Sequence, residues 1–430
     1  MNTTAVDRRQ SEGLERSALG KLQLERLNGL LKAILPENRF YTQKLARGAL
    51  QLDHLEQLSE LPFTVKSELA SDDLQQQLPL NLTWPVDRYV HFHQTSGTRG
   101  RPLSVYDTAD DWQWWIDCWQ YVLDAAEVTA DDRAMLAFSF GPFIGFWSAH
   151  DALVARGALV IPSGGMNTLA RVDLLRRTEA TALFCTPTYA LHLVDVARQH
   201  QIDLAQLSVR KIVVAGEPGG SVPATRKRIE AAWNARVIDH SGASEVGPWG
   251  YADATGRGLH MLESEFIAEF LSVETGAPAA EGELAHLVLT TLRRQGMPVI
   301  RYRTGDLVRP FWSQPGPNRF VWLEGGVLGR ADDMLIIRGM NIFPTAIEQI
   351  LHSFPEVTEF RLTARKRGEI DELVVEVEDR LQDTARIAEE LHLRLGLRIE
   401  VRLAPMASLP RFEGKGERFV DLRQQDAHGD

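Results

Sequence analysis

The chain has 430 residues, of which 44% are hydrophobic and 24% are charged, and its formal net charge is -11. These proportions are ordinary for a globular protein, and the length exceeds what one hydrophobic core usually supports, so we expect two or more domains. The acidic balance argues against a general affinity for nucleic acid or for an anionic membrane. No apolar run approaches the roughly 20 residues that span a bilayer, and residues 1–20 lack an apolar signal core, so we expect a cytoplasmic protein. The two cysteines, Cys118 and Cys185, indicate neither a disulfide framework nor a cysteine-based zinc site, and we expect both to be reduced.

Up to about residue 250 the chain alternates between short apolar runs and amphipathic helices. An opening helix is predicted from Leu24, Leu27, Leu31 and Ile34, which share one helical face, and Pro36 ends it. Strands are expected at residues 134–138, 158–161, 182–185, 211–215 and 237–238, and helices at 171–179 and 224–233. This alternation predicts a mostly parallel sheet covered on both faces.

After Gly258 the pattern changes to strands joined by glycine and proline, which predicts a smaller antiparallel β unit at 283–291, 298–309 and 320–323. Beyond Arg330 we expect a helix from Thr345, paired strands at 359–366 and 371–378, a helix at 384–395 and a strand at 398–403. The predicted fold is therefore α/β, with a large N-terminal domain (1–330) and a small mobile α+β C-terminal domain (331–430). The large domain holds the mostly parallel sheets and the antiparallel unit. The short join contains Asp332, which we interpret as the hinge.

The segment 95–102 concentrates hydroxyls, glycines and arginines in one loop after a predicted strand. Glycines let backbone amides approach phosphate oxygens, hydroxyls donate hydrogen bonds, and arginine supplies charge. The spacing is not that of a Walker P-loop. The loop alone is also typical of a plain polar turn, but together with the motifs below it predicts a triphosphate site. Its expected contacts are Thr95, Ser96, Gly97 and Thr98.

Two carboxylates follow predicted strands in glycine-containing segments. Glu245 comes after Ser244, and a carboxylate beside phosphates is costly unless it holds a cation such as Mg²⁺, which prefers oxygen ligands. Asp306 ends the run 301–306, and its two acceptor oxygens can take both ribose hydroxyls of a nucleotide. The alternatives are a solvated loop acid for Glu245 and a turn-capping residue for Asp306.

Two cationic residues accompany the predicted join between the domains. Arg330 offers a forked donor suited to phosphate. Lys415 lies between Gly414 and Gly416, a setting that by itself is more typical of a surface loop.

Five segments occur in an order that resembles the acyl-adenylate-forming (AMP-binding) enzymes, and most closely the phenylacetate-CoA ligase family. They are TSGTRGRP at 95–102, SEVGP at 244–248, RYRTGD at 301–306, GRADDMLIIRGMNIFP at 329–344 and PRFEGKG at 410–416. The run LPFTVK at 61–66 is similar to the N-terminal arm of that family. The resemblance covers nearly the whole chain, and the order of the motifs is more specific than any one of them.

The resemblance implies an AMP-forming carboxylic acid–CoA ligase. The acid would attack the α-phosphate of Mg²⁺·ATP, giving an acyl-adenylate and pyrophosphate, and the thiol of coenzyme A would then take the acyl group. Lys415 would neutralise charge in the first step. The small domain would turn about Asp332 and present Arg338, Gly339 and Met340 to a coenzyme A tunnel.

The resemblance also assigns the remaining contacts of ATP to Gly216, Glu217, Pro218, His240, Ser241 and Ser244. Many relatives carry an aromatic residue that stacks on adenine where this chain has Ser241. We expect either His240 to stack instead or the segment 216–218 to supply the affinity.

The acid pocket is expected where aromatic residues surround glycines. Its predicted members are Phe138, Phe140, Phe143, Gly145 and Gly242, although core packing is the default for such a cluster. Glycines leave room for a flat ligand, so an aromatic or arylacetic acid is predicted. Close relatives that bind a metal carry extra cysteines, which this chain lacks at 251–253 and 311–313, so no zinc is expected.

Other functions are compatible with the same motifs. The acyl group could pass to a carrier-protein thiol or an amine rather than to coenzyme A. The absence of the stacking aromatic also keeps open a non-catalytic nucleotide-binding homologue. The sequence does not decide whether the protein forms a homodimer.

Overall fold

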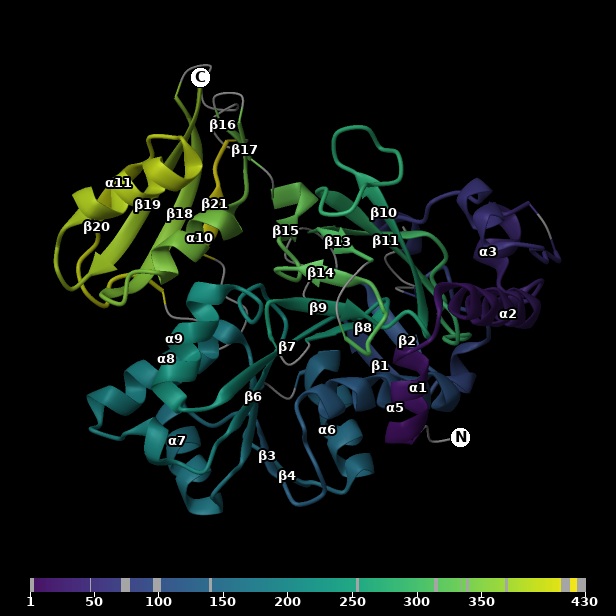
Figure 1. Ribbon diagram of the computed structural model, residues 1–430, viewed down its shortest axis with the longest axis horizontal. Coiled ribbons are helices and arrows are strands. Elements are labelled where there is room, and N and C mark those ends of the chain that lie inside the picture. Colours follow the sequence, from purple (N-terminus) through teal and green to yellow (C-terminus); the bar gives the residue numbers. More distant parts are fainter. Residues whose placement is uncertain are drawn as a thin grey trace.

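The computed structural model describes residues 4–46, 48–70, 78–95, 102–138, 141–252, 255–312, 316–333, 335–337, 340–367, 370–410 and 418–423. A large N-terminal part carries a smaller C-terminal one at one corner (Figure 1). No helix of the described ranges is long and apolar enough to cross a membrane.

The N-terminal arm wraps one side of the large part with helices α1 (Ala5–Glu12), α2 (Arg16–Ile34), α3 (Arg39–Lys44) and α4 (Lys66–Leu69). A 3-10 turn, η1 (Leu55–Glu60), precedes α4. The predicted face of α2 is confirmed, because Leu27, Leu31 and Ile34 are fully buried in one cluster with Ile267 of β10, and Leu24 packs partly buried against it.

The main sheet has nine strands in the order β13-β14-β9-β8-β7-β6-β5-β3-β4. They are β3 (Arg133–Leu136), β4 (Leu159–Pro162), β5 (Ala182–Cys185), β6 (Lys211–Val214), β7 (Arg236–Ala243), β8 (Gly247–Ala252), β9 (Gly258–Met261), β13 (Pro310–Phe311) and β14 (Trp322–Glu324). Strands β4, β3, β5, β6 and β7 are parallel, whereas β7 to β13 are antiparallel. The parallel half was expected. The segment at 320–323, assigned from the sequence to a separate β unit, instead contributes β14 to this sheet.

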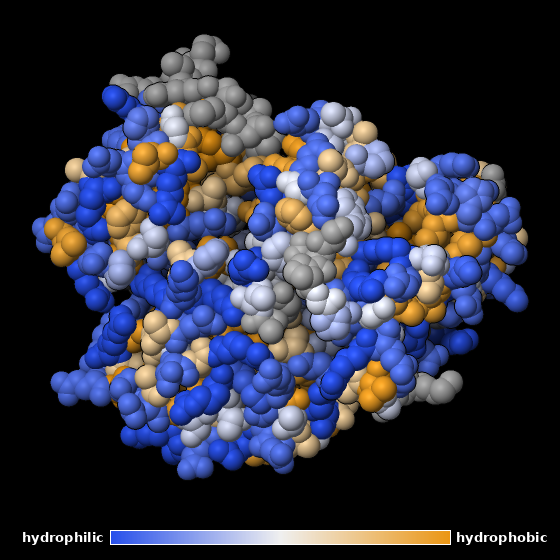
Figure 2. All heavy atoms as spheres, in the orientation of Figure 1, coloured by the Kyte–Doolittle hydropathy of each residue, from blue (hydrophilic) through white to orange (hydrophobic). Residues whose placement is uncertain are grey.

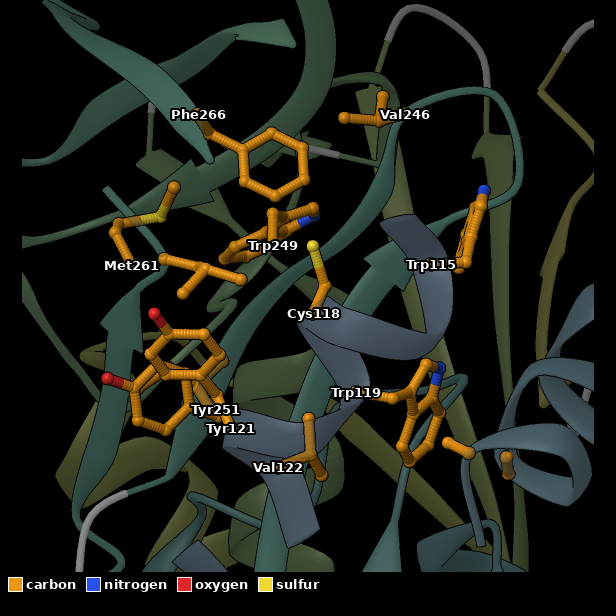
Figure 3. Close-up of a cluster of buried hydrophobic side chains, with 14 of the residues drawn as sticks. Trp115, Cys118, Trp119, Tyr121, Val122, Val246, Trp249, Tyr251, Met261 and Phe266 are labelled. Carbon is orange, nitrogen blue, oxygen red and sulfur yellow. The ribbon is translucent and has the colours of Figure 1, made fainter. Parts of the chain in front are cut away.

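Helices cover both faces of the parallel half, as predicted. They are α5 (Ala109–Ala125) and α6 (Ile144–Arg156) on one face, and α7 (Thr168–Thr178), α8 (Pro187–Gln199) and α9 (Pro223–Trp233) on the other. Side chains alternate between the faces, since Ala182 and Phe184 pack with α5 and α6 while Leu183 and Cys185 pack with α7 to α9. Figure 3 shows the first of these cores, where aromatic residues of α5 meet those of β8 and its neighbours.

A second, antiparallel sheet has the order β10-β11-β12-β15. Its strands are β10 (Phe266–Ser272), β11 (Ala285–Thr291), β12 (Tyr302–Val308) and β15 (Gly329–Arg330). A separate two-stranded sheet pairs β1 (His91–Gln94) with β2 (Ser104–Asp107). Short 3-10 turns occur at η2 (Val86–Arg88), η3 (Leu204–Gln206) and η4 (Ala331–Asp333).

The small part has its own core. It contains the hairpin β16 (Leu335–Ile337) and β17 (Met340–Ile342), then α10 (Pro344–His352), β18 (Val357–Arg367), β19 (Ile370–Asp379), α11 (Thr384–Leu395), β20 (Glu400–Leu403) and β21 (Phe419–Asp421). Helix α11 has the predicted bounds, because Asp383 caps its first amides and Gly396, at φ +67°, ends it.

The two parts meet where α10 lies against α9. Figure 2 shows mainly hydrophilic residues along this seam. Across it, Thr345 Oγ1 donates a hydrogen bond of 2.6 Å to the carbonyl oxygen of Leu328. The contact is therefore polar at its edge.

Candidate functional site

The predicted phosphate loop is the connection between β1 and β2. Its base is closed by reciprocal hydrogen bonds, because the Thr95 amide donates to the Leu103 carbonyl (3.0 Å) and the Leu103 amide donates to Thr95 Oγ1 (2.9 Å). Thr95 is buried there. Ser96, Gly97 and Thr98 lie outside the described residues. The hairpin thus holds both ends of the loop close together, which is suited to a phosphate-binding turn.

Glu245 lies in the turn between β7 and β8 and is buried at 7% exposure. Its Oε1 accepts a hydrogen bond of 2.8 Å from the Tyr302 hydroxyl, and the Lys66 ammonium lies 3.4 Å from the same oxygen. Burial and the neighbouring Glu245 carboxylate raise the pKa of Tyr302 well above its usual value, so this hydroxyl stays a donor. The described residues provide no hydrogen bond to Glu245 Oε2, which leaves that oxygen suited to a cation.

A buried ion pair fixes the backbone just before Glu245. The Arg294 guanidinium donates to the Ser244 carbonyl at 3.1 Å and to Asp107 Oδ1 at 2.8 Å. Both charged side chains are completely buried. Since Asp107 ends β2 and Ser244 follows β7, the pair joins the phosphate hairpin to the Glu245 turn.

Asp306 and Arg330 are direct cross-strand neighbours on β12 and β15. Arg330 Nη1 donates to the Thr304 carbonyl (2.8 Å) and to Asp306 Oδ1 (3.2 Å). Burial raises the pKa of Asp306, the Arg330 charge opposes this rise, and Glu245 adds to it. Glu245 and Asp306 are therefore close enough to influence each other.

Gly305 makes room for this arrangement. It adopts φ +80°, and a Cβ atom there would lie 2.6 Å from Arg330 Nη2. Any larger residue at this position would displace the guanidinium from Asp306.

The hinge candidate Asp332 belongs to the exposed turn η4, and its carboxylate lies 3.6 Å from Arg330 Nη2. Of the predicted tunnel residues, the backbone of Met340 begins β17, whereas Arg338 and Gly339 lie outside the described residues. Lys415 also lies outside them. Buried carboxylates hold the described residues on either side of that segment, by the backbone on one side and by a side chain on the other. Glu378 accepts the amide of Leu409 at 2.7 Å, and Glu359 accepts Arg418 Nη2 at 3.1 Å.

The segment 216–218 follows β6 and faces the small part. Gly216 adopts φ +92°, and Glu217 Oε1 accepts the Thr188 amide at the start of α8 (2.8 Å). Burial raises the pKa of Glu348 on α10 to about 7; Arg418 opposes this rise and Glu217 adds to it. Glu217 is thus next to α10, and the exposed Pro218 follows it at the same seam.

The structure corrects the expectation for His240. Adjacent strand residues point to opposite faces, and His240 points away from Ser241 into the core beneath the site. Its ring packs 4.4 Å from that of Trp119, and its Nδ1 lies 2.8 Å from the Gly250 carbonyl. Burial lowers the pKa of His240 to about 4, so the ring is neutral at pH 7. A ring at 6% exposure cannot also stack on adenine.

Ser241 is half-buried and Gly242 is exposed near the end of β7. A Cβ atom at Gly242 would lie 3.0 Å from the Gly247 carbonyl oxygen, so a larger residue would require the two strands to shift slightly apart. The roles expected for both residues stay predictions.

The aromatic pocket candidates lie beside the phosphate hairpin, because the Gln94 amide donates to the Pro142 carbonyl at 2.8 Å. Phe138 is half-buried against the core, while Phe143 is 41% exposed at the start of α6. A Cβ atom at Gly145 would have no neighbour within 4 Å. Phe140 lies outside the described residues. Phe143 and Gly145 are thus exposed beside the hairpin, and the acid pocket at these residues stays a prediction.

The sequence analysis did not identify four residues of this network: Lys66, Asp107, Arg294 and Tyr302. Two of them carried a signal, since Lys66 ends the LPFTVK run and Tyr302 lies in the RYRTGD run. Asp107 and Arg294 had none, because only the fold brings them together.

Comparisons with known proteins agree with this geometry. Residues 36–266 match the family model "AMP-binding enzyme", and residues 339–423 match "AMP-binding enzyme C-terminal domain". The phenylacetate-coenzyme A ligase of Escherichia coli (strain K12) is 33% identical over 425 residues, which cover 94% of this chain and 95% of that protein.

Two solved structures of 2-hydroxyisobutyryl-CoA ligase share the fold. The postadenylation state in complex with an acyl-AMP aligns with a TM-score of 0.90 at 24% identity, over 98% of this chain and 94% of that one. The thioesterification state aligns with a TM-score of 0.72 at 25% identity, over 99% and 95%. The two parts of this protein are thus arranged more like the first state than the second. The chain belongs to the AMP-binding enzymes, in the group of the phenylacetate-CoA ligases.

Proposed function

We propose that this protein ligates an aromatic or arylacetic acid to coenzyme A with Mg²⁺·ATP, releasing AMP and pyrophosphate. The observation that supports this best is the network of Glu245, Tyr302, Asp306 and Arg330, which unites three motifs distant in the chain. Membership of the family supports the use of ATP and coenzyme A. A non-catalytic homologue would not need this network.

In the first step the carboxylate oxygen of the acid attacks the α-phosphorus, and the bond to the β-phosphate oxygen breaks. No proton moves, so the protein contributes position and charge rather than acid–base chemistry. Asp306 would accept the ribose hydroxyls. The Arg330 guanidinium, which already holds Asp306, would cover the phosphates, and Lys415 would neutralise the charge that develops between the acid and the α-phosphate.

Magnesium fits the residues present. Glu245 is a buried carboxylate, and the donors described around it leave its second oxygen available for an oxygen-seeking cation. When bound, the ion would neutralise the triphosphate. Tyr302 would orient the carboxylate, and the ion pair of Arg294 and Asp107 would hold the backbone beneath it.

In the second step the thiolate of coenzyme A attacks the acyl carbon and AMP leaves. The site must then lose Lys415 and gain the β16–β17 hairpin. Rotation of the small part about Asp332 would make this exchange, with the domain boundary near residue 330. The different TM-scores against two states of one related enzyme support such a rotation.

The acid would lie against the described rings, Phe138 and Phe143, near Gly145. Burying a phenyl ring contributes about 2–3 kcal/mol at roughly 25 cal/mol per Å², which favours an aryl acid over acetate by about 30–150-fold. The name of the E. coli relative points to phenylacetate. No carboxylate lies among the described residues of 137–147 to receive an amino group on the acid, so an amino acid is disfavoured.

Competitive turnover of benzoate, phenylacetate, acetate, octanoate and phenylalanine tests the proposal. Both acid-dependent pyrophosphate exchange and coenzyme A-dependent AMP release should be highest with an aryl acid. Preference for octanoate or phenylalanine would refute the aromatic pocket but leave the adenylation chemistry standing. Exchange without thioester formation would instead favour a carrier-protein thiol or an amine as acceptor. Absence of exchange with every acid would favour the non-catalytic homologue.

A further inference from the structure

The N-terminal arm is fastened to the strand that carries the nucleotide-site residues. Thr64 is fully buried and lies beside β12, where its amide donates to the Arg301 carbonyl and its carbonyl accepts from the Arg303 amide, both at 2.9 Å. Its hydroxyl donates to the Ile300 carbonyl at 2.8 Å. The position of the next residues of the arm is therefore fixed relative to Tyr302.

Phe63 strengthens this attachment from the other side. The guanidinium carbons of Arg301 and Arg303 lie 4.0 and 4.3 Å from the centre of its ring. Lys66 follows three residues later, at the start of α4. An attachment this extensive is more than is needed to anchor a surface lysine.

Lys66 directs its ammonium at the metal-binding candidate. Its Nζ lies 3.4 Å from Glu245 Oε1, while its side chain remains 45% exposed. A half-exposed ion pair of this length contributes little to stability. These features indicate that the lysine serves the ligand rather than the fold.

We propose that Lys66 is a catalytic residue of the adenylation step that binds the β- and γ-phosphates of ATP. This inference rests on the proposed function. With Mg²⁺·ATP bound, Glu245 would hold the metal, and the Lys66 ammonium would pass from the carboxylate to the phosphates. When the bond between the α-phosphorus and its bridging oxygen breaks, the electron pair leaves with pyrophosphate, and Lys66 neutralises the charge gained there. The arm thus acts at the leaving group and Lys415 at the attacked phosphate.

The test compares Lys66→Ala and Lys66→Arg with Lys44→Ala. Lys44 is a matched control, because it belongs to the same arm and pairs with Glu68 of α4 at 2.6 Å, away from Glu245. Lys66→Ala should lower the kcat/KM of pyrophosphate exchange about 10²-fold, by analogy with the loss of one charge-stabilising donor. Thioester formation from supplied acyl-adenylate should change less than about twofold, since pyrophosphate has already left. Lys66→Arg should recover part of the exchange, and Lys44→Ala should match the unaltered enzyme.

A binding measurement separates this inference from the proposed function. Calorimetry with Mg²⁺ and a non-hydrolysable ATP analogue should show weaker binding for Lys66→Ala, whereas AMP should bind both proteins alike. This holds whether or not the right acid has been found. Equal losses in both half-reactions, or an unchanged affinity for the analogue, would overturn the role of Lys66. Failure of the unaltered protein to form any acyl-adenylate would overturn the proposed function instead.

Discussion

Replacing Asp107 by asparagine should destabilise the large part of the protein, because Arg294 would remain buried without a counter-charge. Both side chains are 0% exposed, and Arg294 Nη2 lies 2.7 Å from Asp107 Oδ1. Removing one partner of a buried ion pair typically lowers the free energy of unfolding by about 3–5 kcal/mol. Asparagine keeps one acceptor oxygen, so we expect the loss of unfolding free energy to lie at the lower end of this range, about 3 kcal/mol. At a denaturant slope of about 3 kcal/mol per M, the urea midpoint should fall by about 1 M.

The Trp115 ring, whose centre lies 5.6 Å from the Arg294 guanidinium carbon, makes tryptophan fluorescence a suitable probe of this unfolding. Asp173→Asn is the control, since Asp173 pairs with Arg176 on the surface and its loss should stay within about 0.5 kcal/mol. Asp107→Asn should also raise the Mg²⁺ requirement of adenylation, because Arg294, the partner of Asp107, donates a hydrogen bond to the Ser244 carbonyl. If Asp107→Asn lowers the free energy of unfolding by less than about 1 kcal/mol and leaves the Mg²⁺ dependence unchanged, both the expected destabilisation and the positioning role of Arg294 are refuted.

Lys415→Ala should abolish acid-dependent pyrophosphate exchange, by about 10²–10³-fold, and spare thioester formation from supplied acyl-adenylate; equal losses would make the lysine structural. Glu245→Gln keeps the shape but removes one charge, so the apparent Mg²⁺ requirement should rise in a metal titration; full activity at unchanged Mg²⁺ would assign the ion to another group. Glu378→Gln should weaken the backbone bonds beside the Lys415 segment and slow adenylation more than the second step, and a change in both equally would contradict this. The folded-state pKa of His240 is lowered to about 4, so its contribution to stability is present above pH 6.5 and is lost as the pH falls through about 4. The urea midpoint of His240→Gln should therefore vary less with pH across this window than that of the unaltered protein. An unchanged pH profile would contradict the assignment.

Local sequence signals were sufficient for much of the fold. The limits of α11 followed from a capping aspartate and a terminal glycine, and those of β5 from a short apolar run bounded by polar residues. Long-range pairing was harder to predict. Strand β14 belongs to an ordinary short apolar run, and only its pairing with β9 places it in the main sheet. Likewise, the apolar pair at 237–238 gave no indication that β7 continues to Ala243, because the continuation is polar.

The candidate site shows the same limit. Glu245, Asp306 and Arg330 could be singled out, because each lies in a segment with unusual polar residues next to a strand. The contacts that orient them come from other elements. Tyr302 looks like an ordinary strand residue until its hydroxyl meets Glu245, and His240 looked available until the alternation of β7 placed it under the site. A sequence pattern shows which residues have side chains that could bind a ligand, whereas the register of neighbouring strands decides which of them face it.

The same register couples the nucleotide site to the hinge. Arg330 is the last residue of β15 and donates to Asp306 across the sheet. Asp332 lies two residues later, in the turn that leads to the small part. Thr345, at the start of α10, bonds the Leu328 carbonyl just before that strand. If the small part rotates as proposed, we expect this bond to break and the contact of Arg330 with Asp306 to weaken. Arg330, which would cover the phosphates, is therefore placed where movement of the small part would affect it. Nucleotide affinity and domain rotation should change together.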